Sequence, residues 1–153
     1  MNRNLKTGRL LLIPFLIGGL MLGVWAVQAQ PAPSRASGDT ELLARVIRAE
    51  AEAEPYTGQV AVGAVILNRI QSSKFPKTIA GVVYQPHAFE SVSNGQINRT
   101  PTPSCRKAAR DAISGWDPSG GALFFFNAAK VKGPSYVWTR RIIQRIGKHS
   151  FAL

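Results

Sequence analysis

The chain has 153 residues, 45% of them hydrophobic, and its 19 Lys and Arg against 8 Asp and Glu give a formal net charge of +11. This length suits one domain, and the hydrophobic content is sufficient for a core, which excludes a disordered polyelectrolyte. The single cysteine excludes a disulfide framework within the chain and a cysteine-based zinc site, and the two histidines argue against a histidine-rich metal centre.

The first 29 residues show the three-part pattern of a secretory signal peptide. A basic head with Arg3, Lys6 and Arg9 precedes an apolar run over residues 10–27, and the small residues at 27–29 suit cleavage after Ala29. The run just reaches the length of a membrane-spanning helix, so an uncleaved N-terminal anchor is the alternative, and it is the only membrane contact we expect. In both cases the rest of the chain leaves the cytoplasm.

A short linker and one folded domain follow this signal. Residues 30–38 are rich in Pro, Ser and Ala, as linkers are, and residues 39–153 form the domain. The domain keeps 15 of the 19 basic residues and all 8 acids, a net charge of +7. This charge suits a polyanionic target such as nucleic acid, anionic lipid or bacterial cell wall, or it serves solubility alone. No basic-aromatic motif accompanies it, so we expect no nucleic-acid partner.

Two helices are predicted at the start of the domain. In residues 41–54 the apolar positions have helical spacing, Asp39 or Thr40 can act as the N-cap, and Pro55 disfavours helical geometry at the residue before it. Residues 59–69 are apolar nearly all round, which is typical of a helix buried at the centre of a domain. A buried strand is the alternative for this segment, but its length favours a helix.

The remainder of the domain mixes short helices, loops and strands. Five segments follow in chain order: a helix capped by Thr78 at 78–84, a loop at 85–103 with a hairpin near Asn94-Gly95, a helix capped by Ser104 at 104–114, a strand at 122–126, and a strand or short helix at 142–151. Together the segments predict a compact α+β domain that is mostly helical with a small β element.

Glu50 is an acidic residue on the apolar stripe of the first predicted helix. It follows Ile47 by three residues and Val46 by four. A carboxyl group that faces a core loses hydration, which raises its pKa toward the range that a general acid needs. Glu54 lies near the same face, whereas Glu52 is rotated toward solvent. Two alternatives stay open for Glu50: a buried glutamate paired with an arginine, or a helix that ends one turn earlier.

Four stretches of sequence carry a family resemblance. They are IRAEAEAEPYTGQVAVGAVILNRI, FPKTIAGVVYQPHAFESVSNGQIN, AARDAISGWDPSGGALFFFN and VWTRRIIQRIGKHSFA, and the similarity extends from Leu42 to Phe151. In this order and spacing they resemble the SleB-type cell wall hydrolases, which include the spore cortex-lytic enzymes. The resemblance implies a lysozyme-like fold, peptidoglycan as the substrate, cleavage of its glycan strands in the cell wall or spore cortex, and a regulatory protein partner.

The family's catalytic pattern is close to G-E-A-R-G-E-P. Its first Glu, the catalytic acid, falls on Glu50 and its second on Glu54. Glu52 and Ala53 stand where Arg and Gly are usual, which makes the rim of the pocket more negative. The resemblance implies a lytic transglycosylase in which Glu50 acts alone, first as acid and then as base, with no cofactor, and the sequence shows no metal motif.

Two other functions compete with this one. Hydrolysis as in a lysozyme needs a second carboxylate. The candidates are Glu54, Glu90, Asp111 and Asp117, of which Glu90 is the best because it lies in the long loop. A non-catalytic peptidoglycan-binding protein would keep the groove without turnover.

Cysteine and zinc chemistry have less support in the sequence. A cysteine peptidase would need Cys105 with His87 or His149, and nothing around these residues indicates a triad. A lone histidine is more often structural or exposed, and a zinc amidase needs more histidines than the chain has.

Sugar-binding grooves usually offer aromatic and amide side chains. Seven residues are predicted to line the glycan groove: Glu54, Tyr84, Gln85, Phe89, Phe126, Asn127 and Trp138. For each aromatic ring, packing in the core is the alternative.

Overall fold

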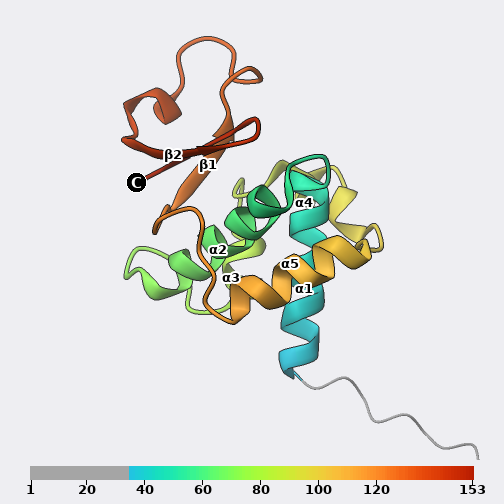
Figure 1. Ribbon diagram of the computed structural model, residues 1–153. Coiled ribbons are helices and arrows are strands. Elements are labelled where there is room, and N and C mark those ends of the chain that lie inside the picture. Colours follow the sequence, from blue (N-terminus) through green and yellow to red (C-terminus); the bar gives the residue numbers. More distant parts are fainter. Residues whose placement is uncertain (1–34) are drawn as a thin grey trace, which may run out of the picture. The chain divides into compact units, whose positions relative to one another are not determined.

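The computed structural model describes residues 35–153, which form a helical part and a small sheet (Figure 1). The helices are α1 (Arg35–Ala51), α2 (Tyr56–Gln71), α3 (Ile79–Val83), α4 (Glu90–Ser93) and α5 (Pro103–Ile113), with 3-10 turns at Gln96–Asn98 and Tyr136–Thr139. The strands are β1 (Phe124–Asn127), β2 (Ile142–Ile146) and β3 (His149–Ala152). The predicted α+β class is confirmed. The predicted signal and the linker up to residue 34 lie outside the described residues.

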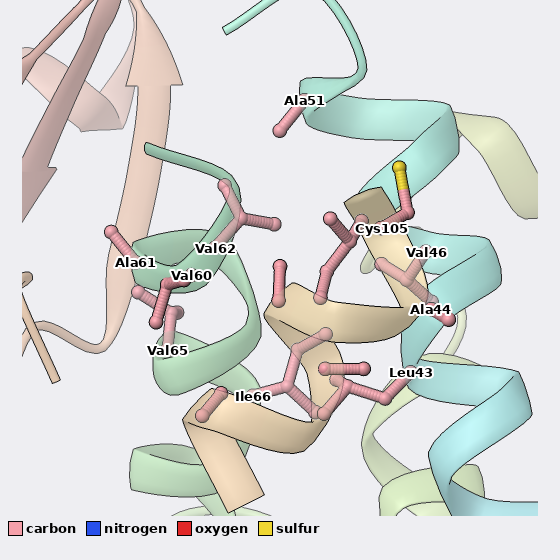
Figure 2. Close-up of a cluster of buried hydrophobic side chains, with 14 of the residues drawn as sticks. Leu43, Ala44, Val46, Ala51, Val60, Ala61, Val62, Val65, Ile66 and Cys105 are labelled. Carbon is pink, nitrogen blue, oxygen red and sulfur yellow. The ribbon is translucent and has the colours of Figure 1, made fainter. Parts of the chain in front are cut away.

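The core lies where α1, α2 and α5 pack against one another. Figure 2 shows side chains of the three helices converging, among them Leu43 of α1, Val62 of α2 and Cys105 of α5. A Cβ atom at Gly63 would come within 3.0 Å of Ile47 Cδ1, so glycine allows α1 and α2 to approach closely. The buried helix predicted over residues 59–69 is confirmed, because α2 contains it. Within residues 35–153, no helix has both the length and the apolar content to cross a bilayer.

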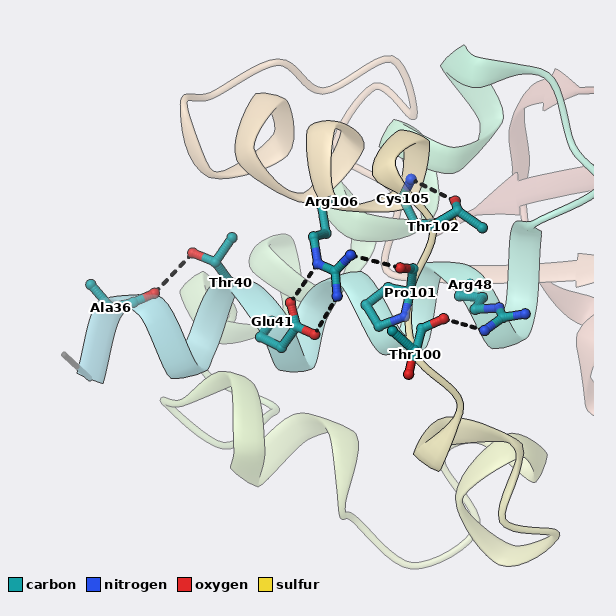
Figure 3. A network of polar contacts seen from close by, with 9 residues as sticks. All are labelled: Ala36, Thr40, Glu41, Arg48, Thr100, Pro101, Thr102, Cys105 and Arg106. Carbon is teal, nitrogen blue, oxygen red and sulfur yellow. Dashed lines mark hydrogen bonds and ion pairs between the residues drawn. The ribbon is translucent and has the colours of Figure 1, made fainter. Parts of the chain in front are cut away.

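The first helix begins earlier and ends earlier than the sequence predicts. It starts at Arg35, so residues 35–38 of the predicted linker are helical, and it ends at Ala51. Thr40 does not cap this helix, because its hydroxyl donates to the Ala36 carbonyl inside it (Figure 3). The carboxylate of the next residue, Glu41, accepts two hydrogen bonds from Arg106, at 2.9 and 3.0 Å, which ties the early part of α1 to α5.

The segment between α3 and α5 is helical where a hairpin is predicted. Thr78 caps α3 as expected, by accepting from the Gly81 N–H. The hairpin near Asn94-Gly95 is wrong, because Asn94 accepts from the Gln96 N–H and turns the chain from α4 into a 3-10 turn. The N-cap of α5 is Thr102 rather than Ser104, because Pro103 takes the first helical position.

Replacing Thr102 with alanine is expected to lower the free energy of unfolding by about 1 kcal/mol. The Thr102 side chain accepts from the Cys105 N–H at 3.2 Å, and alanine leaves this N–H without its cap. Urea denaturation measures the change. Thr102→Ser is the control, since it keeps the hydroxyl oxygen, and equal losses for both variants would contradict the capping role.

The three strands form an antiparallel sheet in the order β1-β3-β2. The strand predicted at 122–126 is confirmed with a shift to Phe124–Asn127, and the segment at 142–151 forms a β2–β3 hairpin rather than a helix. All residues of the central strand β3 are buried. Its His149 stands opposite Asn127 of β1, so both residues lie at the same end of the sheet.

Arg69 links the helical part to the sheet. Its side chain is buried, and its Nε donates to the Leu123 carbonyl, just before β1, at 2.7 Å. The guanidinium lies 5.2–5.6 Å from the ring centroids of Phe75, Phe89 and Phe124. Burial lowers the pKa of Arg69. The strand that follows Leu123 is therefore held at a fixed place beside α2.

Candidate active site

Glu50 lies at a cleft between the end of α1, the α4 region and the sheet. The cleft has a volume of about 420 Å³ and is lined by twelve residues: Ala49, Glu50, Glu90, Ser91, Asn94, Gln96, Phe125, Phe126, Asn127, Lys130, Val131 and His149. The Oε1 atom of Glu50 is buried, and among the described residues it has no hydrogen-bond partner. The structure thus brings an uncommitted carboxyl oxygen to the edge of a polar cavity.

Glu50 has no arginine partner among residues 35–153, and it lies within the helix. The arginine two residues before it, Arg48, pairs with Glu52 at 3.3 Å, and its Nη1 donates to the Thr100 carbonyl (Figure 3). Among residues 35–153 no ion pair involves Glu50. Glu52 is exposed, as the helical rotation predicts. Glu50 is still within the last turn of α1, because the helix ends only after it.

Glu54 lies in the turn that joins α1 to α2, and its side chain is only 7% exposed. A hollow of about 330 Å³ shares Glu50, Asn127 and His149 with the cleft and extends to Glu54. Glu54 Oε2 accepts from the Lys148 N–H at 2.8 Å, and its Oε1 lies 4.0 Å from His149 Nδ1. Glu54 therefore holds the β2–β3 turn against the helical part. The sequence predicted only a glycan-binding role for Glu54 and did not predict this contact.

His149 is the residue of the cleft that sequence reasoning missed. Its side chain is 8% exposed, and its Nδ1 is buried without a hydrogen-bond partner among the described residues. Phe125 meets the ring edge-on, with 5.3 Å between the centroids. Burial lowers the pKa of His149, and the nearby charge of Glu54 opposes this effect. The burial of His149 could have been predicted from strand alternation, which places this residue on the same face as the buried Phe151.

The stability of the protein is expected to fall as the pH drops below about 6.5. The unfolded chain binds a proton at His149 from about this pH downward, whereas the folded state resists protonation because its pKa is lowered. Stability from this residue is thus present above the ordinary histidine range and is lost as the pH falls through the folded pKa. Thermal denaturation between about pH 7 and 5 measures the change, and His149→Gln should flatten this part of the curve. An unchanged curve in that variant would contradict the assignment.

Three of the predicted groove residues lie at or beside the cleft. Phe126 and Asn127, at the end of β1, line it directly. Trp138 packs edge-on against Phe126 with 5.8 Å between the centroids, and half of its surface is exposed. Its indole N–H donates to the Gly133 carbonyl at 3.2 Å. These rings form an aromatic edge next to Glu50, and their contact with a glycan stays a prediction.

Three other predicted groove residues lie away from the cleft. Tyr84 is 57% exposed and lines a separate hollow beside Arg45, and Gln85 is not among the residues that line the cleft. Phe89 is a core residue, 6% exposed, that packs against Phe125 with 6.2 Å between the centroids. The physical reason is the turn before α4, which directs Phe89 inward and leaves polar residues to line this side of the cleft. They are Glu90, Ser91, Asn94 and Gln96.

Of the other acidic residues considered as a second carboxylate, Glu90 lines the cleft, whereas Asp111 and Asp117 do not. Asp111 pairs with Lys107 at 2.8 Å on α5, and Asp117 accepts hydrogen bonds within its own turn. Glu90 lines the first cleft together with Glu50. Cys105 is fully buried in the core, which removes it from any cleft chemistry.

Comparisons with known proteins agree with this fold. The family model described as Cell Wall Hydrolase matches residues 53–152. The chain is 50% identical over 113 residues to the spore cortex-lytic enzyme of Bacillus cereus, which covers 74% of this chain and 43% of that protein. It is 35% identical over 122 residues to the cell wall hydrolase CwlJ of Bacillus subtilis, covering 75% of this chain and 84% of that protein.

Two solved structures are also similar. The catalytic domain of the SleB protein of Bacillus cereus has a TM-score of 0.71 and 44% identity, covering 86% of this chain and 100% of that one. The catalytic domain of the germination-specific lytic transglycosylase SleB from Bacillus anthracis has a TM-score of 0.73 and 45% identity, covering 82% and 100%. The chain spans less than half the length of the Bacillus cereus enzyme it matches in sequence. The expected resemblance is confirmed, and the chain belongs to the cell wall hydrolase family.

Proposed function

We propose that this protein cleaves the glycan strands of peptidoglycan outside the cytoplasmic membrane, as a lytic transglycosylase with Glu50 as its acid and base. The observation that carries the proposal is that Glu50 lines a polar cleft while its buried Oε1 has no hydrogen-bond partner among the described residues. A relative named spore cortex-lytic enzyme and a similar structure named lytic transglycosylase support the same reaction.

One carboxyl group is sufficient for this reaction. Protonated Glu50 donates its proton to the oxygen that links N-acetylmuramic acid to N-acetylglucosamine, and the bond between that oxygen and the muramic C1 breaks. The muramic C6 hydroxyl then forms a bond from its oxygen to C1, and its own proton passes to the Glu50 carboxylate in place of the one given to the leaving oxygen. The products are a free hydroxyl on one fragment and a 1,6-anhydro end on the other, and no water is consumed.

The charge around the cleft suits an anionic polymer. Lys130 lines the cleft, and Arg99, Lys130 and Lys148 line the hollow that continues it. Peptidoglycan carries carboxylates on its peptide stems, so these cations can attract it while the glycan lies along the groove. Glu52 in the same hollow adds negative charge at its rim, which affects the choice of substrate more than the reaction.

Hydrolysis is the second candidate, because Glu90 lines the same cleft as Glu50. In an inverting hydrolase a second carboxylate activates a water molecule across the sugar, at a separation of about 6.5–9.5 Å. Glu90 is exposed at the start of α4, where it can meet water. This arrangement would give reducing ends in place of anhydro ends.

A digest of purified peptidoglycan tests the proposal. We expect the purified protein to release soluble fragments with 1,6-anhydromuramic ends, identified by mass spectrometry. Vegetative peptidoglycan and spore cortex peptidoglycan with muramic lactam serve as parallel substrates. Reducing ends throughout would favour hydrolysis, and no release from either substrate would leave only a peptidoglycan-binding protein.

A further inference from the structure

We propose that His149, oriented by Glu54, is a second catalytic residue whose Nε2 accepts a hydrogen bond from the muramic C6 hydroxyl and directs its oxygen toward C1. This inference rests on the proposed transglycosylase function and adds to it a residue that holds the nucleophile. We call Glu54 and His149 the Glu54–His149 pair.

Docking of the β2–β3 turn onto Glu54 builds the pair. Gly147 has a φ of +57°, and a Cβ atom there would overlap with Glu54 Oε2 and Pro55. The next residue donates its backbone N–H to Glu54 Oε2 at 2.8 Å, and His149 follows directly. The α1–α2 turn and the β2–β3 turn are therefore fitted to each other around one buried carboxylate.

The orientation of the imidazole is fixed on three sides. Phe125 and Phe151 meet the ring edge-on, with centroids 5.3 and 6.2 Å away. On the third side, the buried Nδ1 lies 4.0 Å from Glu54 Oε1. A carboxylate beside Nδ1 favours the tautomer that carries its proton there, which leaves the lone pair on Nε2. Nε2 is thus the nitrogen left to accept a hydrogen bond in the cleft.

The charge state of His149 suits an acceptor. Eight charged residues share a cavity with it: Arg48, Glu50, Glu52, Glu54, Glu90, Arg99, Lys130 and Lys148. Burial and the charge of Lys130 lower the pKa of His149, and Glu54 opposes them without reversing the direction. A neutral imidazole at neutral pH offers a lone pair on Nε2, whereas a protonated ring would donate from both nitrogens.

The proposed reaction needs such an acceptor at its first step. While Glu50 still holds its proton, it is a donor to the glycosidic oxygen and is not available to orient the C6 hydroxyl. Once Glu50 has given up that proton, the hydroxyl turns its hydrogen from Nε2 to the Glu50 carboxylate, which takes the proton as the bond from the hydroxyl oxygen to C1 forms. Glu90, Asn94 and Gln96 also line the cleft, but they are exposed. His149 is buried and has a single held orientation, and it shares both cavities with Glu50. Holding an attacking hydroxyl in a fixed position near the atom it attacks increases the reaction rate.

Three variants test the pair. His149→Ala removes the acceptor and should slow fragment release by about 10²-fold, the loss expected for a misplaced reacting group. Glu54→Gln keeps an oxygen for the Lys148 N–H but turns an amide donor toward Nδ1, which moves the ring proton to Nε2 and should cause a similar loss. His149→Gln keeps an acceptor near the position of Nε2, so it should retain more activity than His149→Ala.

The pH profile and the products separate catalysis from a structural role. In the wild type the rate should fall at acidic pH as His149 becomes protonated, and His149→Gln should lack this fall. In His149→Ala a larger share of reducing ends is expected, because water replaces the unheld hydroxyl. His87→Asn and Glu41→Gln are the matched controls, since His87 is exposed and Glu41 pairs with Arg106 at the surface.

The end groups released by the wild type and the activity of His149→Ala together distinguish failure of this inference from failure of the proposed function. If the wild type releases anhydro ends and His149→Ala matches its rate, pH profile and products, the inference is overturned while the proposed function stands. If the wild type releases no anhydro ends, both fail together. Should His149→Ala not fold in thermal denaturation, Glu54→Gln and His149→Gln give the answer, because each keeps a side chain of similar size.

Discussion

Glu50→Gln should slow the release of glycan fragments by about 10²- to 10⁴-fold, the range for loss of a general acid-base group. Glutamine has nearly the same shape and can occupy the same place at the cleft, but it has no acidic proton to give to the glycosidic oxygen. Since Oε1 has no hydrogen-bond partner among residues 35–153, the exchange removes no hydrogen bond at that atom. The folded state is therefore expected to keep its stability, which thermal denaturation checks.

Binding measurements give this test its control. The variant should still sediment with insoluble peptidoglycan, because the aromatic edge and the cations of the cleft are unchanged. Glu41→Gln makes the same chemical change on the same helix, at a side chain that is 36% exposed and does not line the cleft, and this variant should release fragments at the wild-type rate. Undiminished release by Glu50→Gln would refute the acid-base role and point to another residue of the cleft.

Gly147→Ala is expected to lower both stability and activity. A non-glycine residue at positive φ costs about 1–2 kcal/mol, and overlap of the new methyl group with Glu54 and Pro55 should add about 1–3 kcal/mol. Because the turn must move, the Lys148 N–H and His149 move away from Glu54. Urea denaturation measures the first effect and fragment release the second.

Gly133→Ala isolates the cost of the backbone conformation. Gly133 has a φ of +69°, close to that of Gly147, but a Cβ atom there would meet nothing within 4 Å. We expect Gly133→Ala to lower the free energy of unfolding only by the cost of placing a non-glycine residue at positive φ. Equal losses in the two variants would mean that the contact with Glu54 does not constrain the turn.

Helical periodicity predicts the parts of the site that depend on local sequence. The position of Glu50 follows from its spacing to Val46 and Ile47, both fully buried, and the central place of α2 follows from its apolar surface. Phe126 and Asn127 could be placed at the cleft because an aromatic strand was recognisable. In each case the signal lies within a few residues of the side chain concerned.

The features of the site that the sequence did not predict depend on contacts between distant parts of the chain. Nothing near Glu54 in the sequence shows that the β2–β3 turn docks on it, and nothing near His149 shows that its ring faces this carboxylate. Phe89 and Tyr84 lie away from the cleft lining for a similar reason, since the packing of the α4 region decides which ring turns inward.

The central strand of the sheet is also the last of the three to be made. β3 pairs with both β1 and β2, and it begins at His149, so translation must pass residue 149 before either pairing can form. A nascent chain that already contains Glu50 and helices α1 to α5 still lacks one wall of its cleft. Premature stop codons even a few residues short of β3 should therefore give chains without lytic activity.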